Sequence, residues 1–129
     1  MPIEQLRRCL EGRDWDRLAN VYAPEALLDA NVPQWRFQRR GVEAIAAQYR
    51  VWYPEPVRLV EWAPTATPFG AVVEQAEWTV VDDGETYTRS VHLLHVDGGR
   101  IVHHVLYCTG RWSTSTVERH RTEAPLYDP

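Results

Sequence analysis

From Val57 onward the chain is divided into four long segments by three turns that each contain glycine. The segments span about 57–66, 70–81, 86–96 and 100–112, and the turns are Pro68-Phe69-Gly70, Asp82-Asp83-Gly84 and Asp97-Gly98-Gly99. Glycine beside proline or aspartate is typical of the tight turns that join neighbouring antiparallel strands. The second half is therefore predicted to form an antiparallel meander of four long strands, which restricts the folds open to the chain.

The first half is predicted to form three short helices, with two strands between the second and the third. The helices span about 3–12, 14–22 and 41–52, and the strands about 25–32 and 35–40. In each helix, apolar side chains recur every three or four residues. Asp14 is the expected N-cap of the second helix, Pro24 is expected to end it, and Pro54 follows the third.

Helices first and a meander last predict an α+β protein, in which the helices pack on one face of a strongly curved, mostly antiparallel sheet. Such a sheet forms a cone-shaped α+β barrel, and a pocket is expected at its mouth. A chain of 129 residues can bury a sizeable core, so we expect a single domain over 1–129. Ser113 or Thr114 is expected to cap a short closing helix in the tail.

Composition argues against several classes of partner. The net charge is −4 at pH 7, and Arg36, Arg39 and Arg40 are too few to form a basic stripe. Neither nucleic acid nor a membrane surface is therefore expected as a partner. No segment approaches the roughly 20 apolar residues of a transmembrane helix. The N-terminus lacks the apolar core of a secretion signal and the chain has two cysteines, so we expect a cytoplasmic protein.

Six tryptophans and six tyrosines are the unusual feature of the composition. Aromatic side chains either fill a core or line a pocket for a flat, apolar ligand, and core packing explains each of them at least as well. The aromatic residues expected around the cone are Trp15, Trp35, Tyr49, Trp52, Tyr53 and Trp78. Strand alternation predicts Glu74 on the cone-facing side together with Trp78, and Glu77 on the outer side.

Four of the five histidines lie in the stretch HLLHVDGGRIVHH, around the last predicted turn. Because strand side chains alternate between faces, His92 and His95 point to opposite sides of the sheet, and so do His103 and His104. A three-residue loop at 97–99 sets His92 directly opposite His104, whereas a two-residue Asp-Gly loop pairs it with His103. Hydrophobicity does not decide between the two registers, since both faces are mixed.

A histidine pair alone is a poor metal site. Zinc takes three or four ligands in proteins, and the sequence offers neither a third histidine nor a cysteine pair for it. Cys108 and Leu106 share the predicted face of the pair, and the Cys108 thiol is a candidate third metal ligand. We nevertheless expect neither a metal nor a cofactor. Asp29 is a further candidate base if a bulge turns it into the cone, and otherwise a solvated carboxylate at a strand end.

Three stretches resemble the SnoaL-like and ketosteroid isomerase-like proteins, which share the nuclear transport factor fold. They are LEGRDWDRLANVYAPEALLDANV, GVEAIAAQY and HVDGGRIVHHVLY, and they span most of the chain from Leu10 to Trp112. The resemblance implies that His92 and His104 point into the cone, which selects the three-residue loop. It also implies a homodimer through the outer sheet face, where Tyr107 is expected.

The isomerase pattern of this superfamily is mostly absent from the chain. The general-base aspartate falls at Ala30, and the oxyanion-hole tyrosine falls at Leu6. The second oxyanion donor falls at His92, and only the supporting tyrosine is matched, by Tyr49. Steroid isomerisation by that mechanism is therefore not expected. The superfamily includes both enzymes and binding modules, so function must be argued from the site.

His92 and His104 are the expected proton-transfer pair. In an apolar cone, desolvation and mutual repulsion keep at least one imidazole of a close pair neutral near pH 7, where it can accept a proton. We expect a hydrophobic small molecule to bind there, for isomerase, dehydratase or cyclase chemistry without a cofactor. The alternative is a non-catalytic ligand-binding or protein-interaction module, in which the two histidines hydrogen-bond each other or Tyr49.

Overall fold

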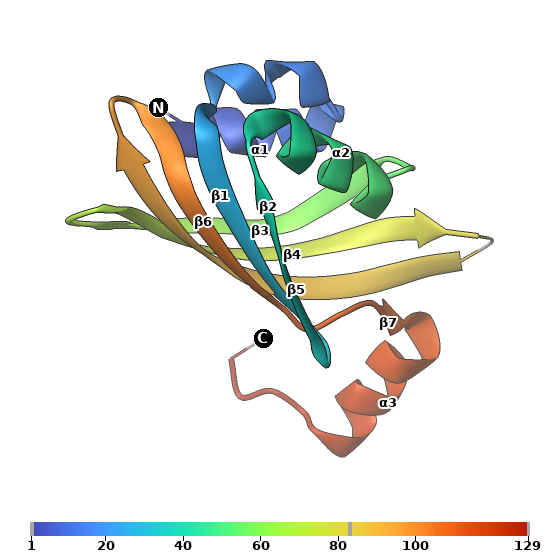
Figure 1. Cartoon of the computed structure of the whole chain (residues 1–129). Helices are drawn as coiled ribbons and strands as arrows, with labels where there is room; N and C mark the ends of the chain where they lie inside the picture. The colour runs from blue at the N-terminus through green and yellow to red at the C-terminus, as the bar shows by residue number, and fades with distance from the viewer. Residues whose placement is uncertain (1, 83, 129) are drawn as a thin grey trace.

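The computed structural model describes residues 2–82 and 84–128. In this part of the chain, the helices of the N-terminal half lie on one side of a curved sheet (Figure 1). The helical segments are α1 (Pro2–Gly12), the 3-10 helix η1 (Trp15–Asn20), α2 (Val42–Trp52) and α3 (Thr114–Glu123). The strands are β1 (Tyr22–Val32), β2 (Trp35–Arg40), β3 (Val57–Thr67), β4 (Gly70–Val81), β5 (Gly84–Asp97), β6 (Arg100–Cys108) and β7 (Trp112–Ser113). Asp83, in a predicted turn, lies outside the described residues.

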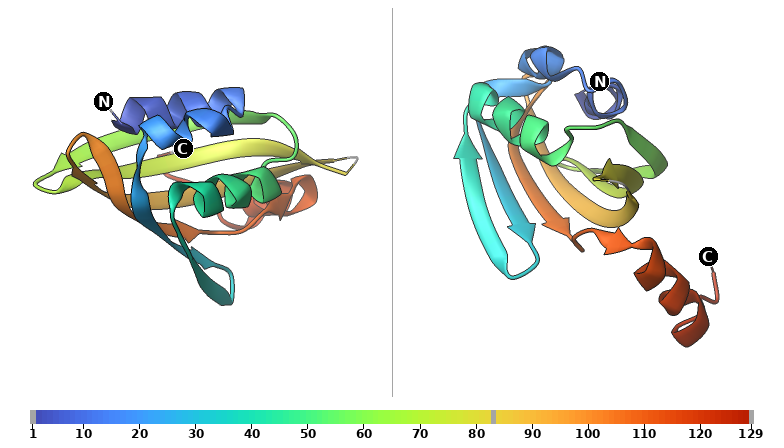
Figure 2. Two further views of the ribbon diagram at one scale, coloured as in Figure 1. Left: turned by 45° about the horizontal axis from the view of Figure 1, so that its top comes forward. Right: turned by 90° about the vertical axis from the view of Figure 1, so that its right-hand side faces the viewer.

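The strands form one mixed sheet in the order β2-β1-β6-β5-β4-β3, with β7 paired to β5. Strands β1 and β6 run parallel, and the other strand pairs of the described chain are antiparallel. The sheet curls around the side on which α1, η1 and α2 lie (Figure 2). This is the expected α+β cone, and its last four long strands form the predicted meander.

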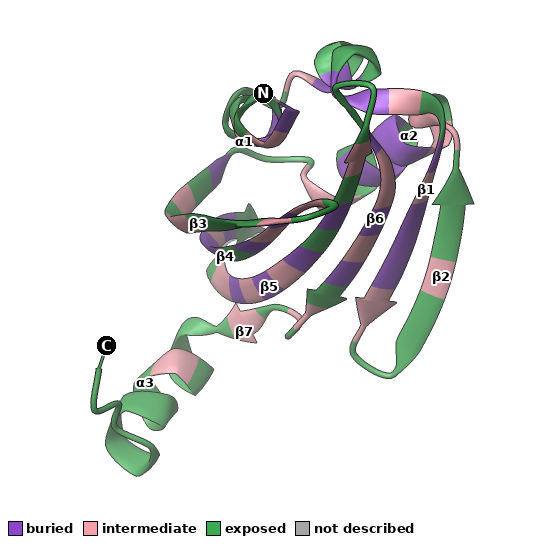
Figure 3. Cartoon of the chain, turned by 90° about the vertical axis from the view of Figure 1, so that its left-hand side faces the viewer, coloured by how far each residue is buried: buried purple, intermediate pink, exposed green. Residues whose placement is uncertain are grey.

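The core lies between these three helical segments and the concave face of the sheet. Helix α1 buries Leu6, Cys9 and Leu10, which recur at helical spacing. Helix α2 contributes Ile45 and Tyr49 in the same way. Buried and exposed residues alternate along β5 and β6, because successive side chains of a strand point to opposite faces (Figure 3). The inward-facing side chains of these two strands therefore contribute to the sheet side of the core.

The predicted helix over 14–22 is wrong at its end. The 3-10 helix stops at Asn20, and Tyr22 begins β1, paired with Ile101 of the parallel strand β6. The Ile101 amide donates to the Val21 carbonyl over 2.8 Å. Pairing with β6 therefore begins where a longer helix would have continued. Tertiary pairing overrides the local helical pattern here.

The predicted register of the β5–β6 hairpin is also wrong. The turn has two residues, Gly98 and Gly99, whose φ values of 61° and 78° match a type I′ turn. The register then shifts between His95 and Val96. As a result His92 pairs with Leu106, and neither of the two predicted partners lies directly opposite it.

The chain leaves the sheet earlier than the predicted strand over 100–112. Strand β6 ends at Cys108, and Gly110, with φ 81°, packs so closely on Pro33 that a Cβ would lie 2.7 Å from the proline ring. Helix α3 follows with Ser113 as N-cap, whose Oγ accepts from the Thr116 amide. It lies beyond the sheet, away from the other helices (Figure 1). None of the described helices has the length and apolarity needed to cross a membrane.

Candidate functional site

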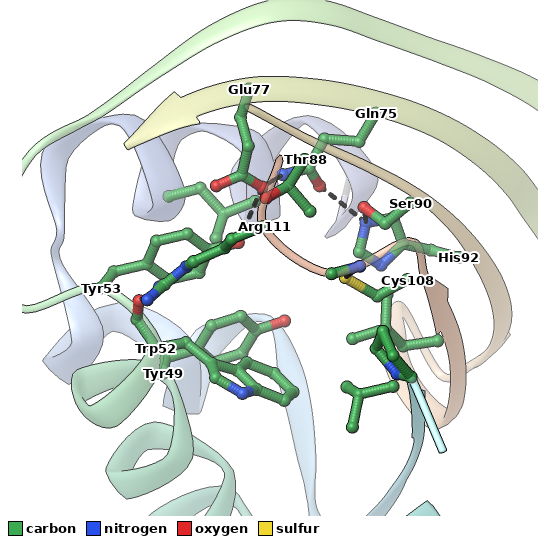
Figure 4. Close-up of a pocket in the computed structure, with 15 residues that line it drawn as sticks. Tyr49, Trp52, Tyr53, Gln75, Glu77, Thr88, Ser90, His92, Cys108 and Arg111 are labelled. Atoms are coloured by element: carbon green, nitrogen blue, oxygen red, sulfur yellow. Dashed lines mark hydrogen bonds between the residues drawn. The ribbon is translucent and has the colours of Figure 1, made fainter. Parts of the chain in front are cut away.

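A cavity of about 280 Å³ lies between α2 and the inner face of the sheet. Its apolar wall is largely aromatic, with Tyr49, Trp52 and Tyr53 at the end of α2 (Figure 4). Leu106 of β6 also lines the cavity. The remaining lining residues are Leu10, Val32, Pro33, Gln75, Glu77, Thr88, Ser90, His92, Cys108, Gly110 and Arg111. An apolar cavity with a few polar groups on one wall is typical of small-molecule sites.

The polar wall comes from β4 and β5, and it corrects the predicted phase of β4. Gln75 and Glu77 are 1% and 3% exposed and line the cavity. The predicted pocket residues Glu74 and Trp78 lie on the outer face, where Glu74 is exposed and Trp78 packs against Tyr87. The predicted outward position of Glu77 is therefore wrong as well, because the inner face of β4 carries Val73 followed by the buried, hydrogen-bonded Gln75, Glu77 and Thr79.

A continuous chain of buried hydrogen bonds crosses the inner face of the sheet. Tyr49 Oη lies 2.9 Å from Tyr22 Oη, which lies 2.7 Å from His104 Nδ1. His104 Nε2 lies 2.7 Å from His92 Nδ1, so the histidines interact diagonally across the hairpin. His92 Nε2 lies 2.6 Å from Gln75 Oε1.

The chain ends on the carboxylate of Glu77. Gln75 Nε2 donates to Glu77 Oε1 over 2.6 Å, and Tyr53 Oη donates to the same oxygen over 2.9 Å. Two donors, one from β4 and one from the residue that follows α2, therefore hold this oxygen.

The contact with Glu77 fixes the direction of every donor behind it. Because the Gln75 amide nitrogen donates to Glu77, its oxygen must accept from His92 Nε2–H. His92 Nδ1 is then an acceptor, which requires His104 to be protonated on Nε2 as well. His104 Nδ1 accepts in turn from the Tyr22 hydroxyl. Both imidazoles are therefore neutral Nε2–H tautomers, and the donors of the whole chain point toward the carboxylate.

Burial keeps the two imidazoles neutral. It lowers the pKa of His92 from 6.5 to about 4. The pKa of His104 is lowered well below its usual value, chiefly by burial and further by the neighbouring His92 and His103. His104 is 0% exposed and does not line the cavity. Only His92 of the predicted pair therefore reaches the cavity, and its nitrogen atoms are occupied by Gln75 and His104.

Glu77 is the group that titrates near neutrality. Burial raises its pKa from 4.5 to about 7, against the lowering effects of the Tyr53 hydrogen bond, the Arg111 charge and the Gln75 hydrogen bond. A carboxylate with such a pKa in an apolar cavity can both accept and donate a proton at neutral pH.

Besides Trp78 on the outer face, the predicted aromatic residues fall into three groups. Tyr49, Trp52 and Tyr53 line the cavity. Trp15 is buried behind them and stacks on Tyr49, with ring centroids 5.3 Å apart, so it belongs to the core. Trp35 is 69% exposed at the start of β2, and its predicted place around the cone is wrong because β2 is an edge strand whose residues are mostly exposed.

Asp29 faces away from the cavity, which contradicts its predicted alternative role as a base. Its neighbours Leu28 and Ala30 fill the inner face, and no bulge interrupts β1 at this point. Its carboxylate accepts from Arg36 over 2.8 and 2.6 Å and from Gln38 over 3.3 Å. The hydrogen bonds from Arg36 lower the pKa of Asp29, so it stays ionised on the outer face.

Within the described part of the chain, no three histidine, cysteine, aspartate or glutamate side chains are arranged to hold a metal ion. The Cys108 thiol lines the cavity and accepts from the Gly110 amide over 3.3 Å. Burial raises its pKa, which favours the thiol over the thiolate that binds metals.

Sequence reasoning missed Tyr22, Gln75 and Glu77. Glutamine and glutamate are exposed in most proteins, so their types gave no signal of burial. Alternation in β4 gave no signal either, because the inner set Val73, Gln75, Glu77 and Thr79 and the outer set Val72, Glu74, Ala76 and Trp78 both begin with a valine.

Comparisons with known proteins place the chain in one fold. Residues 3–104 match the family described as SnoaL-like domain. Among curated protein sequences none matches the chain significantly. The solved structures that resemble the chain share so little sequence identity with it that the likeness shows the fold alone.

Three of these structures illustrate the likeness. IdmH from Streptomyces antibioticus, a proposed polyketide cyclase, has a TM-score of 0.68 at 14% identity, over 83% of this chain and 88% of its own. An NTF2-like protein of unknown function from Mesorhizobium loti has 0.66 at 21%, over 84% and 88%. An LEH-like epoxide hydrolase from M. tuberculosis has 0.64 at 18%, over 83% and 79%.

Proposed function

The chain belongs to the SnoaL-like domain family, and we propose that it binds a hydrophobic small molecule in its cone and moves a proton on that molecule without a cofactor. The reaction type is that of an isomerase, dehydratase or cyclase. Two of the structural relatives are named as enzymes, one a proposed polyketide cyclase and one an epoxide hydrolase, so catalysis has precedent in the fold. Whether this chain is an enzyme depends on the residues of its own site, because one fold hosts many functions.

Glu77 is the observation that supports the proposal most. Its carboxylate lines an apolar cavity, its pKa of about 7 suits proton transfer near neutral pH, and two hydrogen bonds hold one of its oxygens. In the proposed step the ionised carboxylate takes a proton from a carbon next to a carbonyl group of the ligand. The protonated carboxyl then returns a proton to another atom of the same molecule.

We propose that His92 and His104 position Glu77 through Gln75 and do not themselves exchange protons with the ligand. Both imidazoles are neutral, and the nitrogen atoms of each are used in the hydrogen-bond chain. A neutral imidazole whose lone pair already accepts a buried hydrogen bond is a poor base. The Gln75 amide, which has no dissociable proton near neutral pH, separates the imidazoles from Glu77.

Exchange of deuterium into 2-tetralone tests the proton transfer without knowledge of the natural ligand. In D₂O the wild-type protein should speed exchange at the carbon next to the ketone, followed by proton NMR. The rate should rise with pH through about 7, because only the ionised form of Glu77 accepts a proton. Glu77→Gln keeps an oxygen for Tyr53 and Gln75 but cannot titrate, and should be slower by about 10² to 10⁴-fold.

Glu74→Gln is the matched control, since it makes the same change on the outer face of the same strand. It should exchange 2-tetralone at the wild-type rate. Equal rates for wild type and Glu77→Gln would contradict the proposal, as would a wild-type rate that does not change across pH 6 to 8.

A non-catalytic ligand-binding module is the second candidate. The saturated hydrogen bonding of the histidines favours it, because two imidazoles without a free lone pair can act as a rigid pocket wall. Binding of 2-tetralone without faster exchange would select this candidate over the enzyme.

For the assembly, we propose a homodimer through the outer face of the sheet. This face presents exposed apolar and aromatic side chains, among them Leu93 at 37% and Tyr107 at 54% exposure, and the exposed His95 of β5. Light scattering should give the mass of two chains for the wild type and of one chain for Tyr107→Asp. A wild-type mass of one chain at high micromolar concentration would contradict the dimer.

A further inference from the structure

Thr88 carries a buried hydroxyl without a hydrogen-bond partner. The residue is 7% exposed, and its Oγ1 meets no donor or acceptor within residues 2–82 and 84–128. It lines the cavity and pairs directly with Glu77 across β4 and β5. By contrast, the hydroxyls of Thr79 and Thr86, two pairs further along the same strands, bond each other over 2.9 Å. The unpaired hydroxyl thus belongs to the cavity.

An unpaired buried hydroxyl is costly in a folded protein. Nearly all buried polar groups have a partner, and those that do not require an explanation of their own. Here the hydroxyl borders a cavity large enough for a small ligand, beside a carboxylate whose Oε1 is already held by Tyr53 and Gln75. A ligand atom is the partner that this arrangement lacks.

Arg111 supplies a second donor to the same end of the cavity. It follows β6, lines the cavity and donates to the backbone carbonyl of Trp52. A guanidinium has five N–H donors, so this contact leaves others for a ligand. Figure 4 shows Glu77, Thr88 and Arg111 grouped on one side of the cavity, and His92 and Cys108 on the other.

We propose that Thr88 and Arg111 form a subsite for an sp² oxygen of the ligand, a ketone or carboxylate oxygen, next to Glu77. The Thr88 hydroxyl donates to this oxygen, and the Arg111 guanidinium stabilises its negative charge. The apolar body of the ligand lies against Trp52 and Tyr53. The inference rests on the proposed function, because it orients the carbonyl group whose neighbouring carbon faces Glu77.

Three probes of equal ring size test the subsite. Naphthalene has no oxygen, 2-acetylnaphthalene has a ketone and 2-naphthoate has a carboxylate; binding is followed by titration calorimetry. The wild-type protein should bind both oxygen-bearing probes more tightly than naphthalene. Thr88→Val should weaken the binding of 2-acetylnaphthalene by about 3- to 10-fold, which corresponds to the loss of one neutral hydrogen bond. It should leave the binding of naphthalene unchanged. Arg111→Gln should weaken 2-naphthoate by about tenfold or more.

Thr86→Val is the matched control, because it removes a hydroxyl from the same strand without touching the cavity lining. It should bind all three probes as the wild type does. A loss of 2-acetylnaphthalene binding in Thr86→Val equal to that in Thr88→Val would contradict a specific subsite.

Thermal unfolding without ligand gives an independent reading. Thr88→Val replaces an unpaired hydroxyl with a methyl group, so its Tm should rise by about 2 to 5 °C. A lower Tm would mean that the hydroxyl has a stabilising partner in the free protein, and would overturn the proposal.

The outcomes separate the subsite from the function on which it rests. If naphthalene binds and the oxygen-bearing probes bind no better, the subsite is wrong while the apolar pocket stands. If none of the three probes binds, the proposed small-molecule function is wrong, and the subsite with it.

Discussion

Two histidine pairs lie on the same hairpin, on opposite faces. His95 and His103 stand directly opposite each other on the outer face, with ring centroids 5.7 Å apart. His92 and His104 meet diagonally on the inner face, with a hydrogen bond of 2.7 Å between their nitrogens. The inner pair is buried in a chain of hydrogen bonds, whereas His95 is exposed.

The difference teaches that surroundings decide what a histidine pair does. Inside the cone, burial holds both imidazoles neutral. Their proposed role is therefore to orient Gln75 and Glu77 through hydrogen bonds, without a change of charge. The titrating role passes to Glu77, whose pKa is raised by the same burial. The inner face thus converts a group that is acidic in water into a group that exchanges protons at neutral pH.

Removing one histidine from each face should separate the two pairs most clearly. His104→Ala leaves a cavity and strips partners from Tyr22 and His92, so the free energy of unfolding should fall by about 3 to 4 kcal/mol. His103→Ala, the adjacent residue on the outer face, should cost about 0.5 kcal/mol or less. Urea denaturation measures both. Similar losses for the two variants would refute the distinction between the faces.

Two glutamates of β4 sharpen the comparison through pH. The folded-state pKa of Glu77 is raised to about 7, so its contribution to stability is full below about pH 4.5 and is lost as the pH rises through about 7. Glu77→Gln removes this loss. Its unfolding free energy relative to wild type should therefore increase by about 3 kcal/mol between pH 4 and 8.

Glu74→Gln provides the outer-face reference for this measurement, since Glu74 is exposed. Denaturation of the three proteins at a series of pH values gives the curves. A Glu77→Gln curve parallel to wild type over this range would show that Glu77 is not perturbed by burial.

The smallest effect is expected at Asp29, the ionised carboxylate of the outer face. Asp29→Asn weakens its contacts with Arg36 and Gln38 but touches no residue of the cavity lining. Exchange of 2-tetralone should proceed at the wild-type rate. A rate reduced as strongly as in Glu77→Gln would return the role of base to Asp29.

The arrangement of the chain follows well from its sequence, because turn residues and apolar spacing are local signals. Strand alternation correctly placed His92 and His95 on opposite faces, and likewise His103 and His104, since a period of two needs no knowledge of the partner strand. The grouping of His104 with His92 came from the family resemblance. The register did not follow, because the shift between His95 and Val96 leaves no mark in the sequence.

The site follows much less well, because its polar residues are buried by long-range contacts. Nothing near Glu77 in the sequence shows that Tyr53 and Gln75 will hold it, or that α2 will cover it. Tyr22 was assigned to a helix because its spacing fits one, although its hydroxyl completes a chain whose other members come from four different elements. Buried polar networks depend on the whole fold, and local patterns do not encode them.

The central claim is that Glu77 titrates near neutrality while the inner histidines stay neutral. Carbon-13 NMR of the glutamate side-chain carboxyl groups tests it directly, with the Glu77 signal assigned by its absence in Glu77→Gln. The account predicts a midpoint of about pH 7 for this carboxyl. A midpoint near 4.5, the ordinary value for glutamate, would contradict it.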